Sequence, residues 1–215
     1  MKRLIIIGAS GSIGVGVAPT LEKSYVIHRL SRQGTTPSID FTKQNQDLTK
    51  LPEGSFDGVI FAQGINPQYS PFDTYGEHAS NMWQVNIEGP TRFLASIKPR
   101  LNPGACIVFF SSVAKIKGSY DPHYAAVKSA IPGYLASMAR HFPEARFNTI
   151  SLGLVNGSRV QAGMTEDFLA RHRDNMFGNR LISYGTIARA IRFLVDSPEL
   201  HLSDLKVDGG VTGTF

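Results

Sequence analysis

Tyr124, Lys128 and Ser112 are residues whose types and spacing suit proton transfer. Tyr124 and Lys128 are four positions apart, so a helix would place them on one face. An ammonium beside a phenol favours the phenolate and lowers the pKa of the phenol from an ordinary value of about 10. Such a tyrosine exchanges protons with a substrate oxygen near neutral pH. The alternative is a surface Tyr-x-x-x-Lys without chemistry, which the pair alone does not exclude.

The elements that must position these residues alternate between strand and helix patterns. This alternation predicts a single α/β domain over 1–215 with a Rossmann-type, doubly wound, mainly parallel sheet and helices on both faces. The seven expected strands are 2–7, 25–30, a short strand ending near Asp40, 56–62, 105–111, 147–152 and 205–207. The expected helices are 12–23, 78–101, 124–141 and 185–196.

Ser112 follows the apolar run 105–111, so we expect its hydroxyl at the C-terminal end of a buried strand. Ligands of open α/β sheets bind at these ends. Ser111 competes for the same role, but the spacing to Tyr124 favours Ser112. A proton-transfer site at the carboxyl edge of the sheet is the prediction.

Composition excludes several other classes. The 215 residues are enough for one domain with a full core, and Cys106, the one cysteine, excludes an intrachain disulfide. The six histidines are scattered and lack cysteine partners, so we expect no metal site. The net charge is +5, but the sequence contains no run of five basic residues, which argues against a nucleic-acid-binding protein. The N-terminal apolar run is too short for a signal peptide or a membrane helix, so a cytoplasmic protein is expected.

A glycine-rich turn at 8–16 follows the first strand and precedes a helix. This is the context that the dinucleotide fingerprint requires. Glycines let the backbone approach a pyrophosphate, and the helix N-terminus offers free N–H groups and a positive dipole end. A purely structural turn is the alternative, but the position after the first strand favours nucleotide binding.

The end of the second strand bears on the choice of nicotinamide cofactor. Residues 28–32 contain no carboxylate, whereas an acidic residue there would bind the ribose 2′-hydroxyl of NAD. Arg32 and the Ser31 hydroxyl could clamp a 2′-phosphate. We therefore predict NADP(H) in preference to NAD(H). The alternative is that Arg29 and Arg32 are merely solvated.

Taken in order, these motifs resemble the short-chain dehydrogenase/reductase family over nearly the whole chain. Ser12 replaces the middle glycine of the family's glycine motif, and Gly11 is an additional glycine. The segment Ala62-Gln63-Gly64 resembles the family's Asn-Ala-Gly motif but lacks the asparagine. The resembling segments are Gly8–Gly14, Ala62-Gln63-Gly64, Val85-Asn86-Ile87, the set Ser112, Tyr124 and Lys128, Phe177–Leu181 and Val207-Asp208-Gly209-Gly210.

The resemblance implies an oxidoreductase with Tyr124 as general acid in carbonyl reduction and general base in alcohol oxidation. Ser112 would bind the substrate oxygen, Lys128 would hold the nicotinamide ribose, and Asn86 would keep a water in a proton relay. The hydride comes from the cofactor. The implied cofactor-binding residues are Gly8, Ser10, Gly11, Ser12, Ile13, Gly14, Ala62, Gln63, Gly64, Tyr124, Lys128, Gly153 and Val155.

The chain departs from the family pattern in two places. Leu152-Gly153 replaces the usual Pro-Gly, which affects the substrate loop. The link 31–38 is too short for the helix normally found between the second and third strands, so we expect that helix to be missing. The adenine side of the cofactor cleft would then be more open, with Asp40 and Phe41 as its neighbours, through a hydrogen bond and an apolar contact.

Two prolines give the relay a physical basis. Pro90 has no N–H and its ring clashes with the carbonyl of Asn86, so the helix should kink and leave that carbonyl free for water. Pro132 stands in the same relation to Lys128. The alternative is that Asn86 is simply a polar residue at a kink.

The segment 154–184 is the predicted substrate lid. Its apolar candidates are Met164, Phe168, Met176 and Phe177. Its cationic candidates, for an anionic substrate or for solvent, are Arg159, Arg171, His172 and Arg173. Tyr120 and His123 are predicted to line the pocket, and the helices 78–101 and 124–141 to pack in a homodimer or homotetramer.

Other functions stay open on sequence alone. A non-catalytic dinucleotide-binding regulator would keep the fold and lose the chemistry, but the intact Ser112, Tyr124 and Lys128 argue against it. A sugar epimerase could use the Tyr/Lys pair, although 215 residues leave no room for its usual substrate domain. A nucleic-acid-binding protein is supported by net charge alone.

Overall fold

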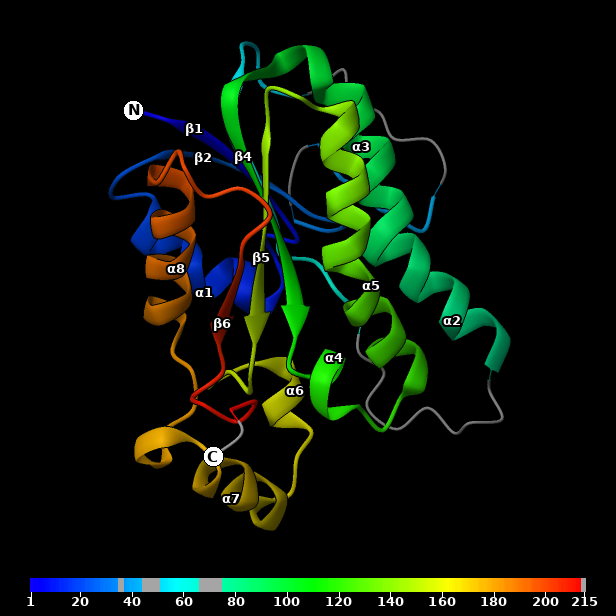
Figure 1. Ribbon diagram of the computed structural model, residues 1–215, viewed down its shortest axis with the longest axis vertical. Coiled ribbons are helices and arrows are strands. Elements are labelled where there is room, and N and C mark those ends of the chain that lie inside the picture. Colours follow the sequence, from blue (N-terminus) through cyan, green and yellow to red (C-terminus); the bar gives the residue numbers. More distant parts are fainter. Residues whose placement is uncertain (35–36, 44–50, 66–74, 214–215) are drawn as a thin grey trace.

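The described residues of the computed structural model, 1–34, 37–43, 51–65 and 75–213, form one six-stranded sheet with helices on both faces (Figure 1). The strand order is β2-β1-β3-β4-β5-β6, and every neighbouring pair is parallel. The predicted Rossmann-like class is confirmed. The strands are β1 Arg3–Ile7, β2 Val26–Leu30, β3 Phe56–Phe61, β4 Leu101–Ser112, β5 Arg146–Leu152 and β6 Asp204–Val207.

Two helical layers cover the sheet (Figure 1). One contains α1 (Ser12–Leu21) and α8 (Tyr184–Asp196), which pack against each other. The other contains α2 (Tyr75–Trp83), α3 (Gly89–Ile97) and α5 (Pro122–Met138). Because both faces are covered, the central strands read as continuous apolar runs. Successive residues of β1 alternate between the two cores: Ile5 and Ile7 face the α3 and α5 side, and Leu4 and Ile6 the other.

The third predicted strand is not formed, so the expectation of seven strands is wrong by one. Ser31 and Ser38 make a single parallel bridge. Between them Gly34 has φ +74°, and the Ser31 and Ser38 hydroxyls donate to the carbonyls of Gln33 and Arg32. These local side-chain bonds offer the backbone an alternative to a ladder. The described parts of 31–55 also contain no helix; residues 35–36 and 44–50 lie outside the described residues.

The predicted helix 78–101 is built from several pieces. Between α2 and α3 lies a π-turn, Gln84–Glu88, in which the Gly89 N–H donates to the carbonyl of Gln84, five residues back. A 3₁₀ turn, Lys98–Arg100, ends the helical stretch. The expected disturbance before Pro90 is therefore real, and it takes the form of a π-turn rather than a plain kink.

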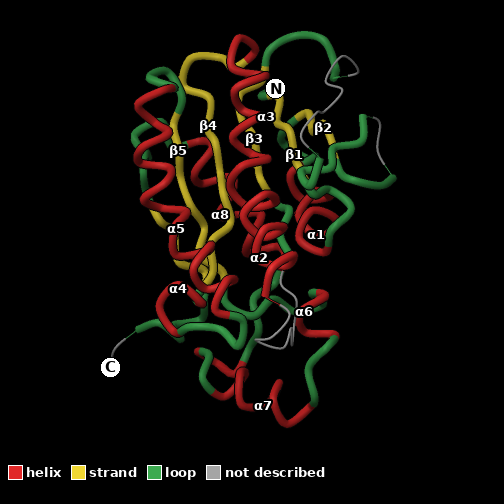
Figure 2. Tube along the Cα trace, turned by 90° about the vertical axis from the view of Figure 1, so that its right-hand side faces the viewer, coloured by secondary structure: helices red, strands yellow, loops and turns green. Residues whose placement is uncertain are grey.

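The polar stretch before α8 contains more helix than its sequence predicts. Ser158 caps α6 (Arg159–Ala162) through the Gln161 N–H, and Thr165 caps α7 (Glu166–Asp174) through the Phe168 N–H. Both helices lie beyond the carboxyl ends of the strands (Figures 1 and 2). This placement puts the predicted lid over the edge of the sheet where ligands of such folds bind.

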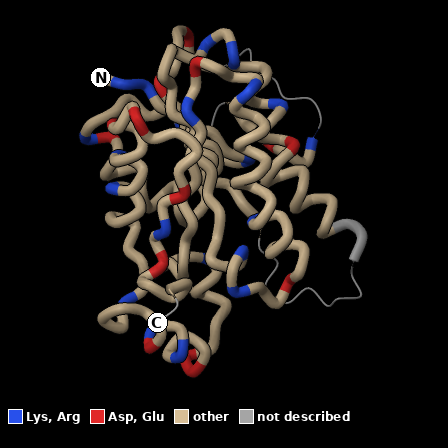
Figure 3. The backbone as a smooth tube through the Cα atoms, in the orientation of Figure 1, with Lys and Arg blue, Asp and Glu red and all other residues tan. Residues whose placement is uncertain are grey.

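The charged residues are dispersed over the fold, with Lys and Arg interspersed with Asp and Glu (Figure 3). In the part of the chain that the structure describes, no helix is both long enough and apolar enough to cross a bilayer. Over the same residues no group of three or more His, Cys, Asp or Glu side chains is arranged to hold a metal ion.

Candidate active site

The strand order reverses direction between β1 and β3. The chain leaves β1 toward β2 on one side, and β3 lies on the other side, so the connections diverge there. This is the position where open α/β sheets bind their ligands. Gly8 and Ala9 donate to the carbonyl of Leu30, and Ala62 donates to that of Ile7 at 2.8 Å. The glycine loop and the segment 62–64 are thereby held side by side.

The glycine loop is shaped by close backbone contacts. Gly8 has φ +83°, and a Cβ added there would lie 2.5 Å from the backbone nitrogen of Gln63. A Cβ on Gly14 would lie 2.4 Å from the Gly8 carbonyl oxygen. Helix α1 therefore starts directly against the loop, and its N-cap, Gly11, offers no side chain to cap the first N–H groups. Such a helix start is suited to a phosphate.

These features fit the nicotinamide cofactor that the fold implies. The glycine cradle leaves backbone amides accessible at a positive helix end. The Oε1 atom of Gln63 is a buried acceptor for which the described residues provide no hydrogen-bond donor. A buried acceptor is normally satisfied, so a ligand hydroxyl or amide would complete this one.

Helix α5 brings Tyr124 and Lys128 to the carboxyl end of β4. Asp121 caps the helix, and its Oδ1 atom accepts from the N–H groups of His123 at 2.8 Å and Tyr124 at 3.0 Å. Pro122 follows in the first turn, where its missing N–H costs nothing. The cap thus fixes the backbone of Tyr124 itself, which is the reason that the helix begins where the predicted acid–base residue stands.

Lys128 and Asn86, predicted as partners, do lie together. The Lys128 Nζ atom donates to Asn86 Oδ1 at 2.8 Å and to the Phe110 carbonyl at 2.9 Å. Asn86 Nδ2 donates to the Met82 carbonyl at 2.9 Å. Lys128 is 5% exposed, and burial lowers the pKa of its ammonium to about 8. The π-turn, β4 and α5 therefore meet at one buried cation.

Tyr124 and Ser112 form the other half of the cluster. Burial raises the pKa of Tyr124, and the nearby Ser112 hydroxyl, which favours the phenolate, opposes that rise. The predicted lowering of this pKa by Lys128 is therefore wrong for the structure. The physical reason is that the ammonium donates to Asn86 and Phe110 and lies 5.8 Å from the centre of the Tyr124 ring.

The two serines at the end of β4 have different partners. Ser111 donates to the Lys128 carbonyl at 2.8 Å, which is the carbonyl that Pro132 leaves without a helical donor. That carbonyl is therefore occupied by Ser111 and is not the free water site that the sequence suggests. Ser112 Oγ accepts from the Ala114 N–H at 3.1 Å, in the short helix α4 (Ala114–Lys117), and reaches Tyr124. Ser112 is the serine in the cluster.

Of the residues expected around the adenine and its phosphate, some are exposed and others are buried. Arg32 is exposed at the end of β2. Ser31 is buried and its hydroxyl proton is donated to Gln33, so it does not face a phosphate as a donor. The Asp40 carboxylate accepts from both donors of Thr42. The side chain of Phe41 is 4% exposed and packs on Gly89 in the core, so the predicted apolar contact of this ring with adenine is wrong.

The residues of the predicted lid likewise include both buried and exposed side chains. Met176 is 3% exposed and packs on Gly209, so it belongs to the core and not to a pocket. The Phe168 ring lies 6.0 Å from that of Tyr120 and 4.4 Å from that of His172, which joins α7 to the loop before α5. Phe177 is 86% exposed. Near the two ends of the same segment, Val155 is buried and forms a parallel bridge with Ile182.

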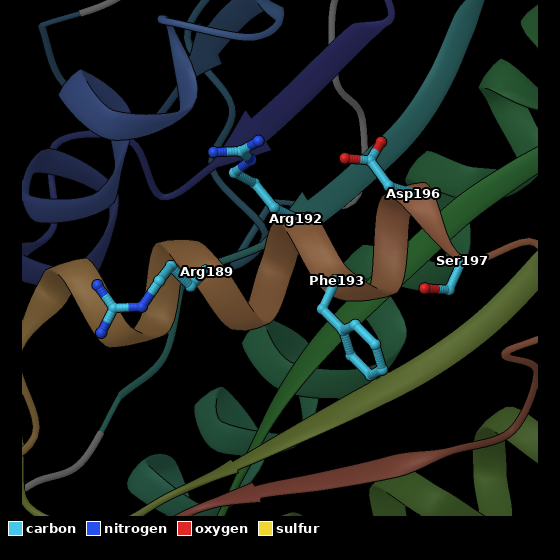
Figure 4. Close-up of a pocket in the computed structure, with 5 residues that line it drawn as sticks. All are labelled: Arg189, Arg192, Phe193, Asp196 and Ser197. Carbon is cyan, nitrogen blue, oxygen red and sulfur yellow. The ribbon is translucent and has the colours of Figure 1, made fainter.

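A separate hollow of about 360 Å³ lies on α8, in the opposite layer from α5 (Figure 4). It is lined by Arg189, Arg192, Phe193, Asp196 and Ser197. The Asp196 carboxylate is already paired with Lys2 and accepts from the Tyr25 hydroxyl at 2.7 Å. None of the catalytic or cofactor-binding residues predicted from the sequence lines this hollow.

Comparisons with known proteins agree with the fold. The sequence model of a family described as Enoyl-(Acyl carrier protein) reductase matches residues 43–212. The chain is 26% identical to Carbonyl reductase family member 4 of Danio rerio, with 98% of each protein covered. It is also 26% identical to Short-chain dehydrogenase/reductase SDRA of Arabidopsis thaliana, where the match covers 74% of this chain and spans 65% of that relative's length.

Two solved structures share the whole fold. A small-chain dehydrogenase in complex with NADPH has a TM-score of 0.85 at 22% identity, with 98% of each chain covered. A 4-hydroxyisoleucine dehydrogenase complexed with NADH has a TM-score of 0.80 at 22% identity, with 100% of each chain covered. The protein belongs to the short-chain dehydrogenase/reductase family. It is therefore an oxidoreductase of the class that acts on carbonyl and alcohol groups.

Proposed function

We propose that the protein transfers a hydride between NADP(H) and a ketone or secondary alcohol, with Tyr124 as the general acid or base. The observation that carries the proposal is the cluster in which the buried Lys128 donates to Asn86 and lies 5.8 Å from the centre of the Tyr124 ring, with Ser112 nearby. Because the pKa of Tyr124 is raised, the phenol stays protonated near neutral pH, which suits proton donation to a substrate carbonyl. When bound, the nicotinamide supplies or accepts the hydride.

The remaining roles follow from the same contacts. The Ser112 hydroxyl would orient the substrate oxygen next to Tyr124. The Lys128 ammonium, with a pKa of about 8, is mostly charged at pH 7 and stabilises the phenolate that forms when the proton leaves. Asn86 holds that ammonium through its Oδ1 atom and, with a water, would return a proton from solvent. The segment 154–184 would cover the substrate as a lid.

The cofactor preference rests on β2. Its end carries Arg32 in an exposed position and no carboxylate, and the nearby Asp40 is occupied with Thr42. A cation at this point stabilises a 2′-phosphate.

NADPH should bind more tightly than NADH, and Arg32→Ala should shrink the difference by about tenfold, roughly the effect of one charge-assisted contact. Fluorescence titration with both cofactors measures this, with Arg29→Ala as the control; equal affinities in the unmutated protein contradict the preference.

The central experiment is a screen of NADPH oxidation over ketones, quinones and 3-oxoacyl thioesters, repeated with Tyr124→Phe. The variant keeps the ring and removes the proton. We expect it to lose at least about a hundredfold in kcat, because general acid catalysis contributes on that order, while NADPH affinity stays close to that of the unmutated protein. Undiminished turnover by Tyr124→Phe would show that another group donates the proton.

We also propose that the protein forms a homodimer or homotetramer through α3 and α5. The outer face of α5 exposes small residues, Ala126, Gly133 and Ala136, which allow close approach of a second helix. A Cβ added at Gly133 would meet nothing within 4 Å. Light scattering tests this, and Gly133→Trp should dissociate the assembly; a monomer at all concentrations refutes the proposal.

A further inference from the structure

We infer that Gln63 is a positioning residue that holds the π-turn carrying Asn86 in its relay position. The inference rests on the proposed function, because it assigns a part in that proton relay. The π-turn leaves one backbone carbonyl, that of Val85, without its usual hydrogen-bond donor. In an α-helix, the carbonyl of Val85 would accept from the N–H of Gly89. Here the Gly89 N–H donates to Gln84 instead.

The defect is not repaired within the helix. In a π-turn the carbonyl of Val85 would accept from the residue five positions on, which is Pro90. Proline has no N–H. Both helical donors are therefore lost to this carbonyl, and Val85 is 8% exposed, so water has little access. Buried backbone carbonyls in native proteins are almost always satisfied, so a donor from outside the helix is required.

Gln63 supplies that donor. Its Nε2 atom donates to the Val85 carbonyl at 3.1 Å, across 22 residues of sequence and from a different element, the carboxyl end of β3. Ala62, which stands where the family motif has asparagine, has no side-chain donor. The amide of Gln63 is thus the group by which this segment fastens the π-turn.

The π-turn is fastened next to the reacting groups. Asn86 directly follows Val85, is 2% exposed, and holds Lys128 through its Oδ1 atom. A Cβ added at Gly64 would lie 3.7 Å from Asn86 Oδ1 and 3.8 Å from Lys128 Nζ, so the segment that follows Gln63 lies over this pair. A shift of the π-turn changes the acceptor of the Lys128 ammonium, and this is how Gln63 acts without touching it.

The test compares Gln63→Leu with Gln84→Leu. Both variants remove a glutamine amide, but Gln84 lies in the π-turn itself, and among the described residues its amide donates to the Ser80 hydroxyl, at 3.5 Å, rather than to a backbone carbonyl. We expect Gln63→Leu to lower kcat for carbonyl reduction at least about tenfold, and Gln63→Asn to recover part of it. Gln84→Leu should behave as the unmutated protein.

A second readout does not require turnover. Titration of the Lys128 ammonium by NMR should show a lower pKa in Gln63→Leu than in the unmutated protein, because the charged form has lost an aligned acceptor. The same pKa should be unchanged in Gln84→Leu. If NADPH affinity falls while kcat at saturation and the Lys128 titration stay fixed, Gln63 is a cofactor contact only. If stability falls alone, its role is structural only.

These outcomes separate the inference from the proposed function. An unmutated protein that turns over none of the carbonyl substrates refutes the proposed function, whereas the Lys128 titration still decides whether Gln63 holds the π-turn. A normal titration together with full kcat in Gln63→Leu overturns the inference and leaves the oxidoreductase activity intact.

Discussion

At the scale of single residues, the cluster depends on where one ammonium directs its hydrogen bonds. Lys128 donates to Asn86 and to Phe110, and burial rather than its neighbours dominates the pKa of both Lys128 and Tyr124. The residue types and their spacing predicted that Tyr124, Lys128 and Ser112 come together, and the family resemblance added Asn86. They were not enough to predict the direction of the tyrosine pKa, because that depends on partners from β4 and the π-turn.

The lowered pKa of Lys128 predicts a pH dependence of reduction. Above a pH of about 8 the ammonium loses its charge and no longer stabilises the phenolate. We expect kcat/KM for carbonyl reduction to be level below that pH and to fall by about tenfold per unit above it, as loss of one essential proton requires. An initial-rate profile from pH 6 to 10 measures this. A profile that stays level up to the ordinary lysine pKa of 10.5 would contradict the assignment.

At the scale of elements, most of the predicted strands and helices are confirmed, and the exceptions share a cause. The third strand fails because Ser31 and Ser38 bond to nearby carbonyls, and the π-turn arises because Pro90 removes a donor. Helices α6 and α7 depend on capping serine and threonine side chains in a polar stretch without apolar periodicity. Each is a local side-chain or proline effect, which periodicity does not record.

The contact between α1 and the glycine loop gives a prediction at this scale. Gly14→Ala places a methyl group 2.4 Å from a backbone oxygen that cannot rotate away. We expect the free energy of unfolding to fall by about 1–3 kcal/mol, as for overpacking elsewhere, and NADPH affinity to fall with it. Urea unfolding and cofactor titration measure the two effects.

Gly185→Ala is the matched control for that substitution, because a Cβ there would make only ordinary contacts, at 3.7 and 3.8 Å, with the side chains of Arg189 and Ser183, and the residue lies inside α8. Alanine should stabilise this helix by about 0.5–1 kcal/mol. If the two variants change stability in the same direction and to the same extent, close packing of the loop is not what requires Gly14.

At the scale of the whole molecule, the strand order decides which distant segments form the site. The reversal of strand order between β1 and β3 joins the glycine loop to Gln63, and β4 and α5 add Ser112, Tyr124 and Lys128. The motifs predicted this edge of the sheet because parallel strands all end there. They could not predict Gln63 as a bridge, because its partner is a carbonyl whose isolation depends on a π-turn in the next element.

The opposite, amino-terminal side of the sheet contains a second charged arrangement, around Phe56. The guanidinium groups of Arg3 and Arg100 lie 5.1 and 4.9 Å from its ring centre, and His28 meets the ring edge-on at 5.4 Å. The Nε2 atom of His28 is buried and has no hydrogen-bond partner among the described residues. Burial, and then the two arginines, lower the pKa of His28.

This arrangement makes stability depend on pH. Because the folded protein resists protonating His28, the unfolded chain binds more protons as the pH falls below the ordinary histidine value of about 6.5, and stability falls with it. One proton contributes a slope of at most about 1.4 kcal/mol per pH unit. Asp196, Asp204 and Asp208 have lowered pKa values, so their contribution is lost only as the pH falls through about 4 and below.

The window between pH 5 and 6.5 therefore isolates the histidine. We expect His28→Leu to flatten the decline of the free energy of unfolding in this window, measured by urea unfolding at several pH values, because the variant has no proton to bind. His141→Gln, which removes an exposed histidine, should leave the decline unchanged. An equal slope in His28→Leu and the unmutated protein would mean that burial and the two arginines do not lower the pKa of His28 in the folded state.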